Sequence, residues 1–189
     1  LIEDTPKVQA NTAPSSRIAR SLAMGAPGDL FLSANLEWSE HVITELKLDS
    51  AALPFANNPL VLISSQADYS WPPETGDRIA IATEQVPVGG YARMALGDSY
   101  DGLTEQFIFA ESATKITQWV RLGEADAGIT YQTEAVGRED VHIVHRFPGI
   151  TATYFALPLN NRAETMLMLQ RMTSSETAEI LEAQGFDRP

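Results

Sequence analysis

Short apolar runs alternate along the chain with segments whose apolar residues recur every three or four positions. The runs at residues 30–32, 60–63 and 127–131 are typical of buried strands, because a strand covered on both faces loses its polar positions. Ile18, Ala19 and Leu22 have the spacing of one helix face. This alternation from end to end predicts an α/β fold built on mostly parallel sheets.

The predicted elements follow this pattern and end at residues that break regular structure. The predicted strands are residues 7–11, 30–32, 60–63, 78–82, 106–109, 127–131, 141–144 and 153–157. One predicted helix begins at Ser15, and a second passes through Trp38, His41 and Val42. Three more cover residues 91–96, 113–122 and 161–172. A last helix is capped by Thr173 and Glu176 and ends at Gly185. Residues 84–90 are expected to form a loop in which Gly89 and Gly90 position Tyr91.

The polar, proline-rich segment at residues 66–76 separates two α/β blocks. Two such blocks joined by extended segments predict two lobes with a cleft between them. Residues 1–65 and 152–189 are expected to form the first lobe, and residues 66–151 the second.

Composition narrows the possible functions. With 44% hydrophobic residues, the 189-residue chain can bury a substantial core. Its net charge of −12 argues against nucleic acid as a partner, because binding to phosphates requires clustered Lys and Arg. There is no cysteine, so disulfides and thiolate metal sites are excluded. The sequence shows no signal-peptide pattern, which fits a mature, trimmed or cytosolic chain.

Hydroxyl groups and helix starts point to an anion site. Ser15 follows Pro14 and is expected to cap its helix, and Ser112 stands in the same place before Ala113. Helix starts carry unpaired backbone N–H groups, which favour anions. Tyr131 ends an apolar strand, at the edge where open α/β sheets bind ligands. Taken singly, each residue is explained as a plain cap or a half-buried aromatic side chain, so the argument depends on the set.

Four motifs in order along the chain carry a resemblance to a known family. They are residues 19–34 (ARSLAMGAPGDLFLSA), 86–92 (VPVGGYA), 123–135 (GEADAGITYQTEA) and 185–186 (GF). With these motifs the chain resembles periplasmic molybdate-binding proteins of ABC importers.

The resemblance implies a two-lobed periplasmic-binding-protein fold whose interlobe cleft holds molybdate or tungstate without a cofactor or catalysis. It assigns the anion to Ser15 through its hydroxyl and amide, to the amides of Ala34 and Ala113, and to the phenol of Tyr131. It also implies a periplasmic location and delivery to an ABC permease in the inner membrane.

The sequence departs from the family at its start. The family begins with a strand and a helix upstream of the position of Leu1, and a serine in the turn between them is a further anion ligand. We therefore expect free strand edges in the first lobe, and a monomer where the upstream segment is present. Ala113 stands where the family commonly has Val, a difference of little consequence for an amide ligand.

Two other function classes stay open at this stage. A degenerate paralogue would keep the fold as a structural or protein-interaction domain without the anion, and an enzyme would use Ser15 as its nucleophile. The sequence lacks a Gly-x-Ser-x-Gly motif, which disfavours a hydrolase. His142 and His145 fall on opposite faces of a strand, which makes them a poor metal pair.

Overall fold

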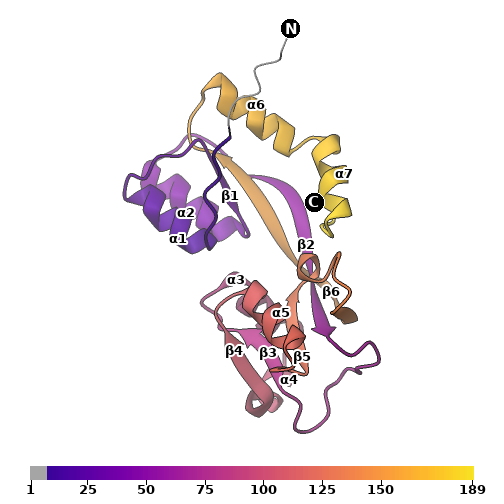
Figure 1. Ribbon diagram of the computed structural model, residues 1–189. Helices are drawn as coiled ribbons and strands as arrows, with labels where there is room; N and C mark the ends of the chain where they lie inside the picture. The colour runs from indigo at the N-terminus through magenta and orange to yellow at the C-terminus, as the bar shows by residue number, and fades with distance from the viewer. Residues whose placement is uncertain (1–7) are drawn as a thin grey trace. The chain divides into compact units, whose positions relative to one another are not determined.

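The computed structural model describes residues 8–189 and divides into two units (Figure 1). Unit 1 comprises the described residues up to Phe55 together with Tyr154–Thr177, and unit 2 comprises Ala56–Thr153 and Ala178–Pro189. The chain passes between them in strands β2 (Leu53–Ser64) and β6 (His142–Pro158), and again in helix α7 (Ser175–Ala183). These boundaries differ from the expected lobe boundaries, and the last twelve residues group with unit 2.

Unit 1 packs two helices against one short strand. Helix α1 (Ser15–Ala23), strand β1 (Leu30–Ser33) and helix α2 (Leu36–Leu46) follow one another, and α6 (Ala163–Met172) comes late in the chain. β1 pairs antiparallel with the end of β6, with Phe31 opposite Leu157. The buried residues of this core are Ala19, Leu22, Phe31, Val42 and Leu157.

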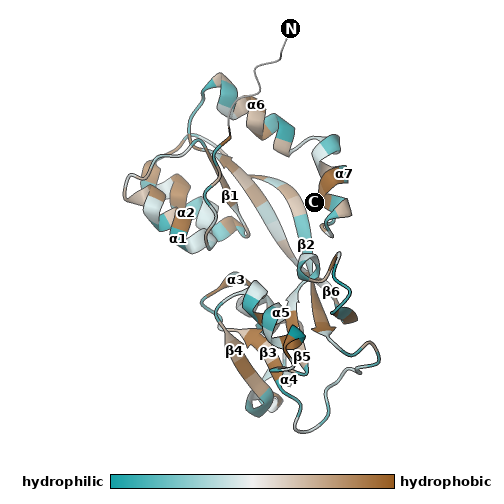
Figure 2. Ribbon diagram, in the orientation of Figure 1, coloured by the Kyte–Doolittle hydropathy of each residue, from teal (hydrophilic) through white to brown (hydrophobic). Residues whose placement is uncertain are grey.

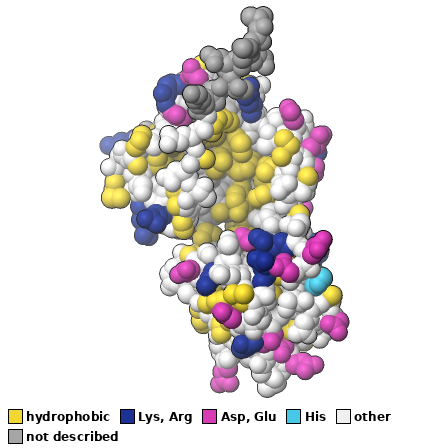
Figure 3. Space-filling view, in the orientation of Figure 1, with side chains coloured by type: hydrophobic (Ala, Val, Ile, Leu, Met, Phe, Trp, Pro, Cys, Tyr) yellow, Lys and Arg dark blue, Asp and Glu magenta, His cyan; other side chains and the backbone are white. Residues whose placement is uncertain are grey.

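The other face of β1 is less completely covered. Phe31 and Ser33 are buried, whereas Leu32 between them is 42% exposed. β1 is also the last strand of the sheet on its side, so one of its edges has no partner strand within residues 8–189. Figure 3 shows a patch of hydrophobic side chains on unit 1, in the upper part of the view.

Unit 2 is built on three parallel strands. β3 (Ile79–Ala82) lies between β4 (Phe107–Ala110) and β5 (Ala127–Tyr131) and is parallel to both. All residues of β3 and β5 are buried, in line with their continuous apolar sequence (Figure 2). The other elements are α3 (Pro87–Leu96), α4 (Ser99–Gly102), α5 (Ala113–Arg121) and the short 3-10 helices η1 (Thr104–Gln106) and η2 (Gln132–Glu134).

The α/β class is confirmed, and the sheet is mixed rather than mostly parallel. Its strand order is β1-β6-β2-β5-β3-β4. The β1–β6 and β2–β5 pairs are antiparallel, whereas β3 is parallel to both β4 and β5. Within residues 8–189, no helix combines the length and the apolar composition that crossing a membrane would require.

Several predicted boundaries were wrong for local reasons. Residues 8–11 form no strand, and Lys7 of that predicted strand lies outside the described residues. The predicted loop at residues 84–90 ends early, since α3 begins at Pro87, a residue favoured in the first helical turn. The predicted cap at Thr173 is replaced by Ser174, whose Oγ accepts the Thr177 amide at 3.2 Å.

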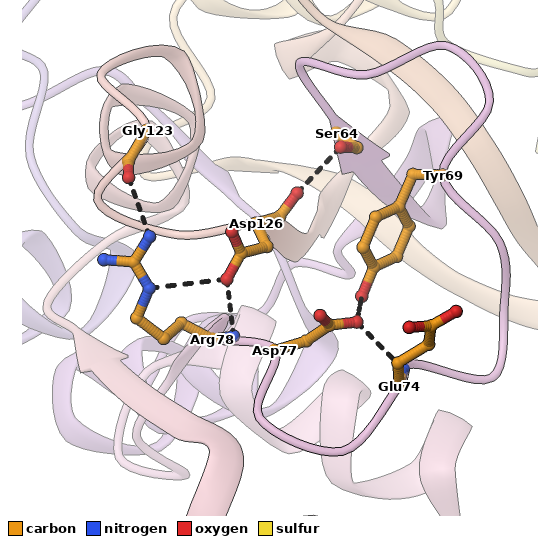
Figure 4. A network of polar contacts seen from close by, with 7 residues as sticks. All are labelled: Ser64, Tyr69, Glu74, Asp77, Arg78, Gly123 and Asp126. Atoms are coloured by element: carbon orange, nitrogen blue, oxygen red, sulfur yellow. Dashed lines mark hydrogen bonds and ion pairs between the residues drawn. The ribbon is translucent and has the colours of Figure 1, made fainter.

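A polar network connects the start of β3 to the start of β5 (Figure 4). The Arg78 amide donates to Asp126 Oδ2 at 2.8 Å, and the Arg78 side chain donates to the same oxygen and to the Gly123 carbonyl. Ser64 Oγ donates to the Asp126 carbonyl at 2.7 Å. Partial burial alone would raise the pKa of Asp126, but the hydrogen bonds from Arg78 outweigh it and hold that pKa below its ordinary value.

We expect Asp126→Asn to destabilise the protein by about 1 kcal/mol at pH 7, because a neutral amide loses the charge-assisted part of these bonds. The lowered pKa of Asp126 means that its contribution is complete above the unfolded-state pKa, near 3.9, and is lost as the pH falls through the folded-state value. Urea unfolding at pH 7 and at pH 3 measures both effects.

Asp101→Asn is the matched control, since Asp101 pairs with Arg93 and is 82% exposed. The role of the Asp126 charge would be contradicted if Asp126→Asn lost no more stability than Asp101→Asn. It would also be contradicted if the loss of stability in Asp126→Asn were the same at pH 3 as at pH 7.

Candidate functional site

Ser15 and Ala34 are brought together in unit 1. The Ala34 amide donates to Ser15 Oγ at 3.1 Å, although the residues are 19 positions apart. This bond joins the first residue of α1 to the turn between β1 and α2. The hydroxyl oxygen of Ser15 thus acts as an acceptor, which leaves its O–H able to donate to a ligand.

Ser15 does not cap its helix as the sequence suggested. Pro14 is the N-cap of α1, with extended φ and ψ of −52° and 138°, and no side chain caps this end. The Pro14 carbonyl accepts the amides of Arg17 and Ile18, whereas the amides of Ser15 and Ser16 have no acceptor within residues 8–189. The start of α1 therefore offers two amides and one hydroxyl to an acceptor ligand.

The start of α5 offers a second set of donors, in unit 2. Ser112 caps this helix as predicted, because its Oγ accepts the Lys115 amide at 3.2 Å. The Ser112 carbonyl accepts the Ile116 amide. The amides of Ala113 and Thr114 have no acceptor in the described part of the chain and carry the positive end of the helix dipole.

Tyr131 lies beside this helix start. It is the last residue of β5 and is 7% exposed. The hydroxyl of its neighbour Thr130 lies 3.5 Å from the Ala113 carbonyl, which joins the end of β5 to the start of α5. Sequence reasoning placed Ala113 and Tyr131 together, and unit 2 has them on adjoining elements.

Helix α3 contributes a group that sequence reasoning missed. The rings of Tyr91 and Tyr131 meet edge to face, 6.4 Å apart, so α3 lies next to Tyr131. Burial raises the pKa of Tyr91, which keeps its phenol protonated. Because residues 84–90 were expected to be a loop, the Val88 amide in the first turn of α3 was overlooked. Pro87 was the available signal, since proline favours the first helical position.

Each unit therefore holds its own set of hydrogen-bond donors. Unit 1 has the start of α1 with Ser15, and unit 2 has the starts of α5 and α3 with Tyr131. All these groups are amides or hydroxyls, which stabilise negative charge through dipoles. This chemistry suits a small anion that presents acceptor oxygens, and it supplies neither a general base nor a nucleophile activated by one.

The structure gives His142 and His145, which the sequence showed to be a poor metal pair, no shared site. His145 stacks on Trp71 at 5.7 Å and meets Phe147 edge to face at 4.9 Å, while His142 is exposed. Within residues 8–189, no three His, Asp or Glu side chains gather in a way that could hold a metal ion.

Comparison with known proteins shows what this chain is similar to. A family described as "Bacterial extracellular solute-binding protein" matches residues 3–187. The molybdate-binding protein ModA of Escherichia coli is 30% identical over 199 residues, covering 95% of this chain and 77% of that protein.

Solved structures show the same fold. The substrate-binding domain of a putative molybdenum ABC transporter from Clostridium difficile has a TM-score of 0.76 at 27% identity, covering 97% of this chain and 86% of that one. The periplasmic molybdate-binding protein of Azotobacter vinelandii has a TM-score of 0.77 at 22% identity, covering 93% and 85%, and supports the fold alone.

Proposed function

Because the chain belongs to the family of bacterial extracellular solute-binding proteins, which are non-enzymatic components of transport, we propose that it captures molybdate or tungstate for an ABC permease. The observation that carries the proposal is the pair of donor sets, one at the start of α1 and one at the starts of α5 and α3. The molybdate-binding names of the relatives support the choice of anion. A periplasmic location and a partner in the inner membrane belong to the same proposal.

In this function the two units act as lobes that close on the anion. Ser15 supplies its hydroxyl and amide from the first lobe, while the Ala113 amide and the Tyr131 phenol bind from the second. The Ala34 amide, which the resemblance assigned to the anion, donates to Ser15 Oγ and holds that oxygen in place. An anion that needs donors from both lobes favours the closed arrangement over the open one.

Selectivity follows from a site that only donates. Molybdate at neutral pH is a dianion with four acceptor oxygens, whereas phosphate retains protons that need an acceptor. The other donors of the site are mostly backbone amides, which cannot accept a hydrogen bond, and the Ala34 amide already takes one of the two acceptor positions of Ser15 Oγ. A phosphate hydroxyl would therefore be poorly satisfied, at a cost of about 1–3 kcal/mol.

We therefore expect phosphate to bind at least about tenfold more weakly than molybdate at pH 7. Isothermal titration calorimetry with molybdate, tungstate, sulfate and phosphate measures this order directly. Sulfate is the control for size, since it is a smaller dianion that carries no proton at this pH. Phosphate affinity equal to that of molybdate would contradict the donor-only site, and the absence of binding by all four anions would favour a degenerate paralogue.

A further inference from the structure

The chain crosses the boundary between the units three times, in two neighbouring strands and, between Thr177 and Ala178, in helix α7. β2 crosses between Phe55 and Ala56, and β6 crosses between Thr153 and Tyr154. Any change in the arrangement of the units must bend both strands near these positions. Side chains that restrain them there affect the lobes without touching a ligand.

Asn57 uses its backbone and its side chain at this crossing. Its amide and carbonyl form a reciprocal pair of 2.8 Å hydrogen bonds with the carbonyl and amide of Asp187. Its side-chain Nδ2 donates to the Arg188 carbonyl at 3.0 Å. Its Oδ1 accepts the hydroxyl of Thr153 at 2.8 Å. One residue of β2 thus holds both β6 and the C-terminal segment, whose end lies beside β2 (Figure 1).

Neighbouring residues strengthen this connection within unit 2. Asn58 is 1% exposed, and its Nδ2 donates to Thr133 Oγ1 at 2.9 Å. Gln132 Nε2 donates to the Gly185 carbonyl at 2.8 Å. The segment at residues 185–188 is therefore fixed to β2 and to η2, while Arg188 also forms an ion pair with Glu182.

We propose that Asn57 is a positioning residue for the hinge: by joining β2, β6 and the C-terminal segment, it limits the bending of the crossing strands. The inference rests on the proposed closure around an anion. Loss of the restraint populates more arrangements of the units, and apparent affinity falls in proportion to the fraction that can bind.

Because the sequence contains no cysteine, spin labels can be attached at two introduced cysteines alone. Cysteines introduced at Glu45 on α2 and at Glu105 on η1, both exposed, place one spin label on each unit. Electron–electron double resonance then gives the distance distribution in the ligand-free protein. We expect Asn57→Ala to widen this distribution and to weaken molybdate binding three- to tenfold, and Thr153→Val to produce a smaller change in the same direction.

Thr165→Val is the matched control. Thr165 Oγ1 donates to Asn160 Oδ1 at 2.7 Å within unit 1, so the variant removes a similar bond away from the crossing. If the Thr153 hydrogen bond had only a structural role, Thr153→Val and Thr165→Val would both lower the thermal stability. Their spin-label distance distributions would then be the same.

The outcomes separate this inference from the proposed function. Unchanged distributions in Asn57→Ala and Thr153→Val would overturn the hinge role, whatever the anion affinity. A wild-type protein that ignores molybdate while Asn57→Ala still widens the ligand-free distribution would overturn the proposed ligand and support the hinge role.

Discussion

Replacing Gly89 by alanine is expected to destabilise unit 2 by roughly 3 kcal/mol, because the added methyl group has no room. A Cβ at this position would lie 2.0 Å from the Thr83 carbonyl oxygen and 2.5 Å from that of Ala82. Both atoms belong to the backbone at the end of β3, so no side chain can rotate away. The first turn of α3 would have to move.

The neighbouring glycine provides the control. Gly90 lies in the same helical turn, and a Cβ there would meet nothing within 4 Å. Gly90→Ala is therefore expected to be neutral or to stabilise the protein by about 0.5–1 kcal/mol through helix propensity. Urea unfolding of the two variants measures the difference, and equal stabilities would show that α3 can move away from β3 at little cost.

Gly89→Ala also affects the proposed site, because α3 lies beside Tyr131 through Tyr91. In the absence of urea, where Gly89→Ala is folded, we expect this variant to bind molybdate more weakly than Gly90→Ala does. The close approach of α3 to β3 is thus expected to help hold Tyr91 against Tyr131.

The sequence predicted best those features that depend on neighbours along the chain. The strand at β5 and the cap at Ser112 follow from a continuous apolar run and from a hydroxyl before a helical pattern, and both are confirmed. Gly185 was expected to end the last helix, and its φ of +90° fits that role.

Features that depend on distant partners were not predictable in the same way. Ser15 was expected to cap its own helix, but its oxygen accepts an amide 19 residues away. Residues 141–144 and 153–157 were expected as separate strands, but Gly149 with its φ of +75° lies within one long strand, β6. The direction of pairing likewise depends on which strands become neighbours, so a mostly parallel sheet was wrong for β1 and β2.

The candidate site shows the same division. Local patterns made Ser15, Ala113 and Tyr131 candidate donors, because hydroxyls and helix starts can be recognised from neighbouring residues. The family resemblance then assigned these three residues and Ala34 to the anion. The hydrogen bond between Ala34 and Ser15, and the place of Val88 in the first turn of α3, could be found only from the fold. The C-terminal contacts of Asn57 lie 130 residues away along the chain and leave no signal in a single sequence.

Replacing Tyr131 by phenylalanine is expected to weaken molybdate binding about tenfold to a hundredfold. The change removes one hydroxyl from a ring that is 7% exposed and keeps the ring packing against Tyr91. A hydrogen bond to a charged group contributes about 1.5–3 kcal/mol, which corresponds to this loss of affinity. Calorimetric titration with molybdate measures the effect, and thermal unfolding shows whether the fold is retained.

Tyr100→Phe is the control for this prediction, since Tyr100 is also buried in unit 2 and packs on Phe107 at 5.0 Å between ring centroids. Tyr100 lies in α4 and not at one of the helix starts that carry the donors. Removing its hydroxyl should therefore leave the molybdate affinity unchanged. Equal molybdate affinities for Tyr131→Phe and Tyr100→Phe would show that the Tyr131 phenol does not reach the anion. In that case the second lobe would bind through backbone amides alone, and Gly89→Ala, which displaces the start of α3, would become the variant with the larger loss of affinity.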